Sequence, residues 1–135
     1  MALVTGAGRG IEQALALKFA KEGARLVVND LDASAVDDTL LLVKEQGAEA
    51  LGCPGSVTER DCGERFVSQA VDSFGGINII VNGAGYTWDA IIQKSPRGRL
   101  HEGGAAHLRR RAAVLDSVLR SGEATSGPQK ELGLA

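Results

Sequence analysis

The chain begins with a short apolar segment that leads directly into a glycine loop. Residues 2–4 predict a buried strand, and Gly6, Gly8 and Gly10 follow it. Because such a turn has no side chains, its backbone N–H groups can approach a phosphate closely. From Ile11 the sequence predicts a helix, whose N-terminus presents free N–H groups and the positive end of its dipole to an anion. The opening of the chain therefore predicts an α/β unit with an anion site at the loop.

An acidic residue stands at the end of the second predicted strand. Residues 25–29 predict that strand, and Asp30 follows it, twenty residues after Gly10. At this spacing a carboxylate meets the ribose hydroxyls of a bound dinucleotide. A glycine triplet alone also suits an ordinary tight turn, and Asp30 alone suits a strand-end turn, but the combination favours dinucleotide binding. Asp30 would repel a 2′-phosphate and so favours NAD over NADP, whereas Arg9 in the loop could pair with a phosphate.

Strand and helix patterns alternate along the first part of the chain. Strands are expected at residues 2–4, 25–29, 48–53 and 77–81. Helices are expected at residues 11–22, 33–46 and 58–74, the first with an apolar face that starts at Ile11 and the last capped by Thr58. This alternation predicts a parallel sheet with helices on both faces, and right-handed crossovers give the strand order 3-2-1-4. The expected fold class is therefore α/β, a truncated Rossmann-like doubly wound sheet whose fourth strand is buried on both faces.

The composition changes near residue 94. Residues 1–90 hold 7 Lys or Arg and 13 Asp or Glu, a balance of −6, whereas residues 91–135 hold 8 and 4, a balance of +4. We expect residues 1–94 to form a dinucleotide-binding half domain and residues 95–135 a basic, atypical tail. Within the tail, residues 105–119 are compatible with a helix, and the residues after them are typical of disorder. The apolar strand at 77–81 has no visible partner on one side, so we expect self-association through this sheet edge.

The sequence also argues against several classes of protein. No apolar run reaches membrane-spanning length and the chain starts on a strand rather than on a signal peptide, so we expect a cytoplasmic protein without a membrane partner. Cys53 and Cys62 lack the spacing of zinc ligands, and His101 and His107 do not share a helical face, so no metal site is expected. The run Arg109–Arg111 has no interleaved aromatic residues, which argues against nucleic acid as a partner.

Three segments match motifs of one enzyme family. The loop from Thr5 to Glu12 corresponds to T-G-x-x-x-G-x-G, Ser56-Val57 to an adenine-binding D-V, and Asn82-Gly83-Ala84-Gly85 to N-N-A-G. Over roughly residues 1–94 the chain thus resembles the short-chain dehydrogenase/reductase family. Together with Asp30, the resemblance implies a cofactor site at the loop and the strand ends. The expected cofactor-binding residues are Gly6, Gly8, Arg9, Gly10, Ile11, Asp30, Leu31, Ser56, Val57, Asn82, Ala84 and Gly85.

Three positions depart from the motifs of this family. Glu12 replaces the last glycine of the loop, and its carboxylate suits the helix N-terminus but competes with a pyrophosphate for the same field. Ser56 replaces an aspartate, which weakens a hydrogen bond to the adenine. Gly83 replaces the second asparagine, which is expected to loosen the end of the fourth strand. We therefore expect NAD binding to be weak but real.

The resemblance implies hydride transfer between NAD(H) and an alcohol/ketone pair. In this family a tyrosine acts as the general acid and base, and a lysine four residues later assists it and holds the nicotinamide ribose. The chain has one tyrosine, Tyr86, and Ala90 stands four residues later. We therefore expect no catalytic residues in this chain and no activity of the chain alone. The alternatives are a non-enzymatic dinucleotide-binding remnant and a frame-shifted, truncated product.

Overall fold

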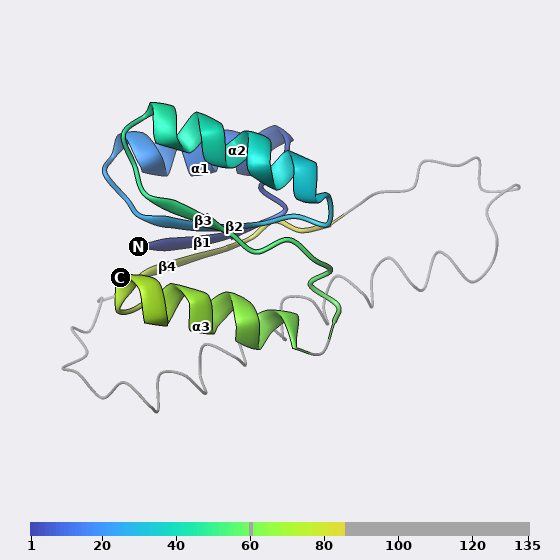
Figure 1. Cartoon of the computed structure of the whole chain (residues 1–135). Coiled ribbons are helices and arrows are strands. Elements are labelled where there is room, and N and C mark those ends of the chain that lie inside the picture. Colours follow the sequence, from blue (N-terminus) through green and yellow to red (C-terminus); the bar gives the residue numbers. More distant parts are fainter. Residues whose placement is uncertain (60, 86–135) are drawn as a thin grey trace, which may run out of the picture.

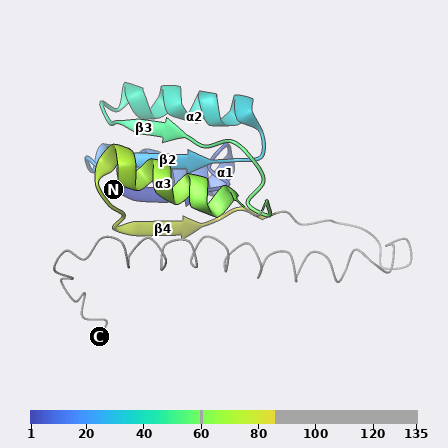
Figure 2. The ribbon, with the colours of Figure 1, turned by 60° about the horizontal axis from the view of Figure 1, so that its bottom comes forward.

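Four parallel strands form a sheet in the computed structural model, which describes residues 1–59 and 61–85. The strands are β1 (Ala2–Thr5), β2 (Leu26–Asn29), β3 (Ala50–Gly52) and β4 (Ile79–Asn82). The helices are α1 (Gly10–Lys21), α2 (Ala33–Glu45) and α3 (Cys62–Phe74). Helices α1 and α2 cover one face of the sheet and α3 covers the other (Figure 1). Figure 2 shows the strands side by side in the order β3-β2-β1-β4.

The two central strands are apolar on both faces because helices pack on both sides of the sheet. Successive side chains of a strand point to opposite faces. Val4 of β1 and Val28 of β2 therefore pack with Ala16 of α1, whereas Leu3 of β1 packs with Phe66 of α3. Each of these side chains is at most 1% exposed. Burying one of the larger ones stabilises the fold by roughly 1.5–3 kcal/mol.

The pairing register brings the ends of three strands to the same level. Thr5, the last residue of β1, stands opposite Asn29 of β2 on one side and Asn82 of β4 on the other. The loops that follow these strands therefore meet at one edge of the sheet. This edge carries the candidate functional site.

The predicted α/β class, the alternation of strands and helices and the strand order are confirmed. The predicted start of the third helix at Thr58 is wrong, because α3 begins at Cys62. The Thr58 N–H donates to Ser56 Oγ at 3.3 Å, and the Glu59 N–H donates to the Ser56 carbonyl at 3.0 Å. These bonds form a local turn, which competes with a helix for the same backbone groups.

Two predictions about burial are also wrong. Residues 77–81 are not buried on both faces, because β4 pairs only with β1 among the described residues and Ile79 is 42% exposed. The apolar face of the first helix does not start at Ile11, which is 81% exposed. Helix α1 instead buries Ala16 and Ala20, which pack with Val4 and Val28 of the sheet. Ile11 lies in the first turn of the helix, outside this cluster.

The predictions for residues 95–135, including the helix at 105–119, lie outside the described residues, and so does Tyr86. Across the part of the chain that the structure describes, no helix combines the length and the apolar character needed to cross a bilayer.

Candidate functional site

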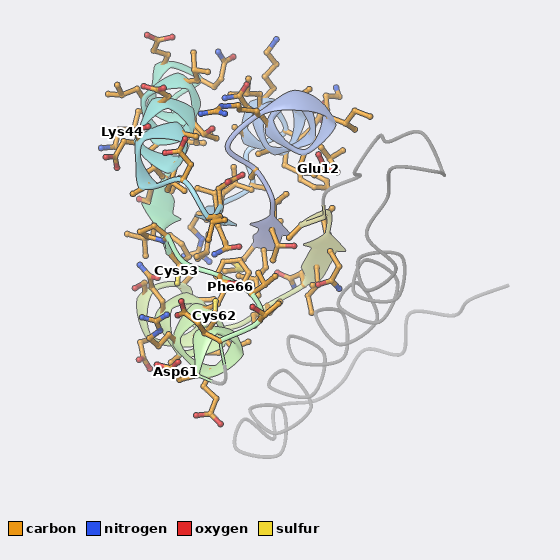
Figure 3. All side chains as sticks on the ribbon, turned by 90° about the vertical axis from the view of Figure 1, so that its right-hand side faces the viewer. Glu12, Lys44, Cys53, Asp61, Cys62 and Phe66 are labelled. Atoms are coloured by element: carbon orange, nitrogen blue, oxygen red, sulfur yellow. The ribbon has the colours of Figure 1, made fainter. Side chains whose placement is uncertain are left out.

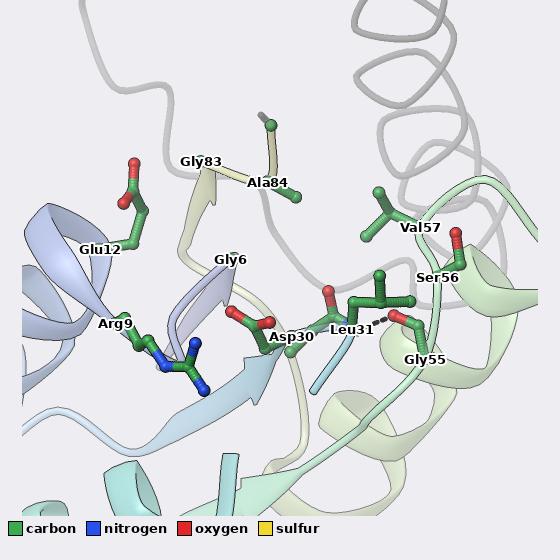
Figure 4. A pocket seen from close by; sticks show the side chains of 12 residues that line it. Gly6, Arg9, Glu12, Asp30, Leu31, Gly55, Ser56, Val57, Gly83 and Ala84 are labelled. Atoms are coloured by element: carbon green, nitrogen blue, oxygen red, sulfur yellow. Dashed lines mark hydrogen bonds between the residues drawn. The ribbon is translucent and has the colours of Figure 1, made fainter. Parts of the chain in front are cut away.

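A cavity of about 390 Å³ opens among the loops that follow the four strands (Figure 4). The strand order reverses between β1 and β4 at this edge, and open parallel sheets bind ligands at such a reversal, outside the carboxyl ends of the strands. The cavity is lined by Gly6, Arg9, Glu12, Asn29, Asp30, Leu31, Gly55, Ser56, Val57, Gly83, Ala84 and Gly85.

The glycine loop lies in close backbone contact with its neighbours. At Gly6 the φ angle is +73°, and a Cβ there would stand 2.9 Å from the Cα and N atoms of Ala84. At Gly8 a Cβ would stand 2.7 Å from the Cβ of Ala35 in α2. Glycine is therefore required at Gly6 by conformation and space, and at Gly8 by space alone.

Asp30 ties the end of β2 to the glycine loop. Its Oδ2 accepts a hydrogen bond from the Gly8 N–H at 2.9 Å, and its Oδ1 accepts one from the Asp32 N–H at 3.2 Å. The carboxylate also lines the cavity. Asp30 therefore acts as a turn residue at the strand end and, at the same time, presents a charged acceptor to the cavity.

Asp32 holds the arginine of the loop, a role that the sequence did not predict. Arg9 Nη2 lies 2.6 Å from Asp32 Oδ2, and the Arg9 side chain is 76% exposed. Asp32 also caps α2, since its Oδ1 accepts from the N–H and the hydroxyl of Ser34 at 3.1 and 2.8 Å. The Ser34 hydroxyl holds the pKa of Asp32 below its usual value. Asp32 therefore stays charged at neutral pH and keeps its ion pair with Arg9 until the pH falls well into the acid range.

Two polar residues at strand ends position the surrounding loops. The buried Asn29 Nδ2 donates to the carbonyls of Cys53 and Gly55 at 2.7 and 3.0 Å. Thr5 Oγ1 accepts from the Ala84 N–H at 3.2 Å. The only sequence signal for these roles is a polar residue at the end of an apolar strand, and the partners of that residue cannot be read from the sequence.

A second pair of side chains supports the glycine loop from α1 and α2. Gln13 Nε2 donates to the Gly8 carbonyl at 3.1 Å and to Thr39 Oγ1 at 2.9 Å. The fully buried Thr39 hydroxyl lies 2.9 Å from the Ala7 carbonyl. The loop is thus held by both helices of the same face, which keeps its backbone N–H groups in a defined arrangement.

Most of the predicted cofactor-binding residues come together at the cavity. Eight of them line it: Gly6, Arg9, Asp30, Leu31, Ser56, Val57, Ala84 and Gly85. Four of them do not: Gly8, Gly10, Ile11 and Asn82. Gly8 acts through its N–H on Asp30, Gly10 opens α1 with a φ of +70°, and Asn82 ends β4 opposite Thr5. Four further lining residues were not among those predicted: Glu12, Asn29, Gly55 and Gly83.

The two cysteines lie on the α3 side of the sheet. Figure 3 shows Cys53 and Cys62 near Phe66, and both thiols are free and buried. Burial raises the pKa of each thiol, so both stay protonated at neutral pH and are poor nucleophiles. Among residues 1–59 and 61–85, no group of three or more His, Cys, Asp or Glu side chains is placed to hold a metal ion.

The fold and the cavity define a nucleotide-binding domain of the doubly wound α/β class. The family described as short chain dehydrogenase matches residues 1–102, and the chain belongs to this family of oxidoreductases. The family uses NAD(P) as its cofactor. The resemblance predicted from the loop, Ser56-Val57 and the Asn82–Gly85 segment is thereby confirmed.

Similar proteins include several oxidoreductases. Peroxisomal multifunctional enzyme A of Dictyostelium discoideum is 40% identical over 125 residues, which cover 82% of this chain and 28% of that protein. The 3-oxoacyl-(acyl-carrier-protein) reductase FabG of Thermotoga maritima is 39% identical over 97 residues, covering 67% of this chain and 37% of that protein. This chain thus spans well under half of either relative.

A solved structure supports the same assignment of the fold. The alcohol dehydrogenase from the archaeon Thermococcus sibiricus, complexed with 5-hydroxy-NADP, is similar with a TM-score of 0.79 and 26% sequence identity. The similarity covers 93% of this chain and 54% of that one.

Replacing the buried Asn29 by alanine should destabilise the cavity edge. In Asn29→Ala the carbonyls of Cys53 and Gly55 lose their donor, so the free energy of unfolding should fall by about 1–3 kcal/mol in urea titrations. Gln69→Ala is the matched control, because Gln69 is only partly buried and makes one bond to the Gly52 carbonyl. An equal loss in both variants would contradict the role assigned to Asn29.

Proposed function

We propose that this chain binds NAD as the cofactor-binding part of a short-chain oxidoreductase that moves hydride between NAD(H) and an alcohol/ketone pair. The observation that carries the proposal is the Asp30 carboxylate, which lines the cavity while the Gly8 N–H holds it at 2.9 Å. A carboxylate at the end of the second strand is the acceptor that a dinucleotide ribose requires.

The N-terminus of α1 supplies the second part of the proposed site. Arg9 precedes this helix and makes no side-chain capping hydrogen bond to it, so the N–H groups of the first turn are open to a ligand oxygen. A pyrophosphate is the part of a dinucleotide that such a helix end attracts. Gly6 lines the cavity without a side chain, and nothing lies within 4 Å of the place that a Cβ of Gly10 would take at the start of the helix. The residues present therefore fit the cofactor, which supplies the hydride when bound.

The remaining lining residues suit the two ends of a dinucleotide. Leu31, next to Asp30, is 76% exposed and offers an apolar surface that a flat base could cover. We assign Leu31, Ser56 and Val57 to the adenine, and Ala84 and Gly85, with Asn82 behind them, to the nicotinamide ribose. The assignment is supported by the position of all but Asn82 in the cavity lining.

The proposal gives this chain cofactor binding rather than catalysis on its own. Acid–base catalysis in the family depends on a tyrosine and a lysine four residues later, and here Ala90 follows Tyr86 at that spacing. A dinucleotide-binding remnant without enzymatic activity shares the same cavity. Neither of the two predicts turnover by the purified chain, so NAD-dependent oxidation of secondary alcohols by it would contradict both.

Titration calorimetry with NAD tests the proposed site directly. Wild type should bind NAD, and Asp30→Asn should bind about tenfold more weakly, because a charge-assisted hydrogen bond contributes about 1.5–3 kcal/mol. Asp37→Asn is the matched control, since Asp37 is an exposed aspartate of α2. The proposed function would be contradicted if the two variants bound NAD with equal affinity, or if wild type did not bind NAD.

The preference for NAD over NADP is a second proposal at the same site. Asp30 would repel a 2′-phosphate, and Arg9, which could attract one, is held by Asp32 at 2.6 Å. We expect Asp32→Asn to raise the affinity for NADP relative to NAD about fivefold, because it releases Arg9 while asparagine keeps the cap of α2. The double variant Asp32→Asn with Arg9→Ala should lose this gain. If NADP binds wild type as tightly as NAD, the proposed preference is wrong.

We also propose that copies of this chain associate through β4. In the described residues β4 pairs with β1 alone, and an exposed apolar edge strand recruits other strands. Wild type should form oligomers at micromolar concentration in sedimentation velocity, and Ile79→Lys should reduce them. Leu41→Lys, at an exposed position of α2, controls for the added charge. A monomeric wild type would exclude this proposal.

The cytoplasmic location belongs to the proposal as well. It is supported by the two free thiols, because a reducing compartment keeps cysteines unpaired.

A further inference from the structure

Glu12 and Gly83 come from different elements and lie against each other at the cavity (Figure 4). Glu12 belongs to the first turn of α1, and Gly83 directly follows β4. A Cβ at Gly83 would stand 2.7 Å from Glu12 Oε1, 2.8 Å from its Cδ and closer still to its Cγ. Real Cβ atoms essentially never show such contacts. A side chain at residue 83 and Glu12 in its present place therefore exclude each other.

The backbone gives no other reason for a glycine at residue 83. Gly6 and Gly10 have positive φ angles, whereas Gly83 does not. Its conformation is therefore open to other residues. The three atoms that would lie nearest to a Cβ at Gly83 all belong to Glu12. The glycine is thus explained by the Glu12 side chain.

The charge of the cavity depends on this pair. Its described lining carries two carboxylates, those of Glu12 and Asp30, and one cation, Arg9, which is already paired with Asp32. The N-terminus of a helix stabilises a carboxylate in its first turn. Glu12 therefore occupies the field that would otherwise act on a phosphate of the ligand.

We infer that Gly83 is a positioning residue, which admits the Glu12 carboxylate to the cavity wall, and that the pair determines specificity against strongly anionic ligands. A methyl group at residue 83 displaces the flexible Glu12 side chain from this place. The inference rests on the proposed function only for the identity of the ligand, a nicotinamide dinucleotide.

A thermal double-mutant cycle tests the positioning role without any ligand. In the Glu12→Gly background, Gly83→Ala should raise Tm by about 3 °C, because alanine reduces the entropy of the unfolded chain and the three atoms nearest to its Cβ are gone. With Glu12 present, the same change should leave Tm unchanged or lower it, because the Cβ meets Glu12. An equal change of Tm in both backgrounds would overturn the inference.

Titration with NAD tests the effect of the charge. Glu12→Gln keeps the size of the side chain and should bind NAD about fivefold more tightly at low salt, with a gain that shrinks as salt is added. Gly83→Ala should strengthen binding in the same salt-dependent way. Glu45→Gln, an exposed glutamate at the end of α2, is the control and should change nothing. If Glu12→Gln behaves like this control, the specificity role is wrong. If no variant binds NAD, the proposed function fails, and the thermal cycle still decides the role of Gly83.

Discussion

The parallel pairing of β1 with a strand on each side is the constraint on which the rest of the structure depends. Thr5 stands level with Asn29 and with Asn82, so three strands end at one edge. Parallel neighbours cannot be joined by tight turns and need crossovers, which here are the helices on both faces. The cavity therefore lies at this edge of the sheet, because every loop that lines it continues from a strand end or leads into a helix.

Polar side chains at strand ends hold the loops at this edge, and two of them, Thr5 and Asn29, are buried. Asn29 bonds two carbonyls of the segment after β3, Thr5 bonds the segment after β4, and Asp30 bonds the glycine loop. In a low-dielectric interior a satisfied polar network is rigid, while an unsatisfied one is costly. The cavity is thus kept in shape by the same residues that place acceptors and donors at its wall.

The electrostatics of the cavity are determined by contacts between residues of different elements. Arg9 is a cation in the loop, yet Asp32 neutralises it. Glu12 and Gly83 look like two separate departures from the family motifs, one adding a charge and the other loosening a strand end. In the structure they are complementary, because the space that Gly83 leaves open is filled by Glu12. Their effects on binding should therefore be considered jointly.

The sequence by itself determined the α/β class, the order of the elements, the glycine loop and Asp30, because these depend on short-range patterns of apolar residues and glycines. It also identified the family. It did not determine the start of α3, the exposure of Ile11 and Ile79, or the roles of Thr5, Asn29 and Asp32. Tertiary structure alone decided that Ala84 bonds Thr5 across 79 positions and that Glu12 meets Gly83. Such contacts arise only when the packed sheet brings distant strand ends together, and local patterns carry no information about them.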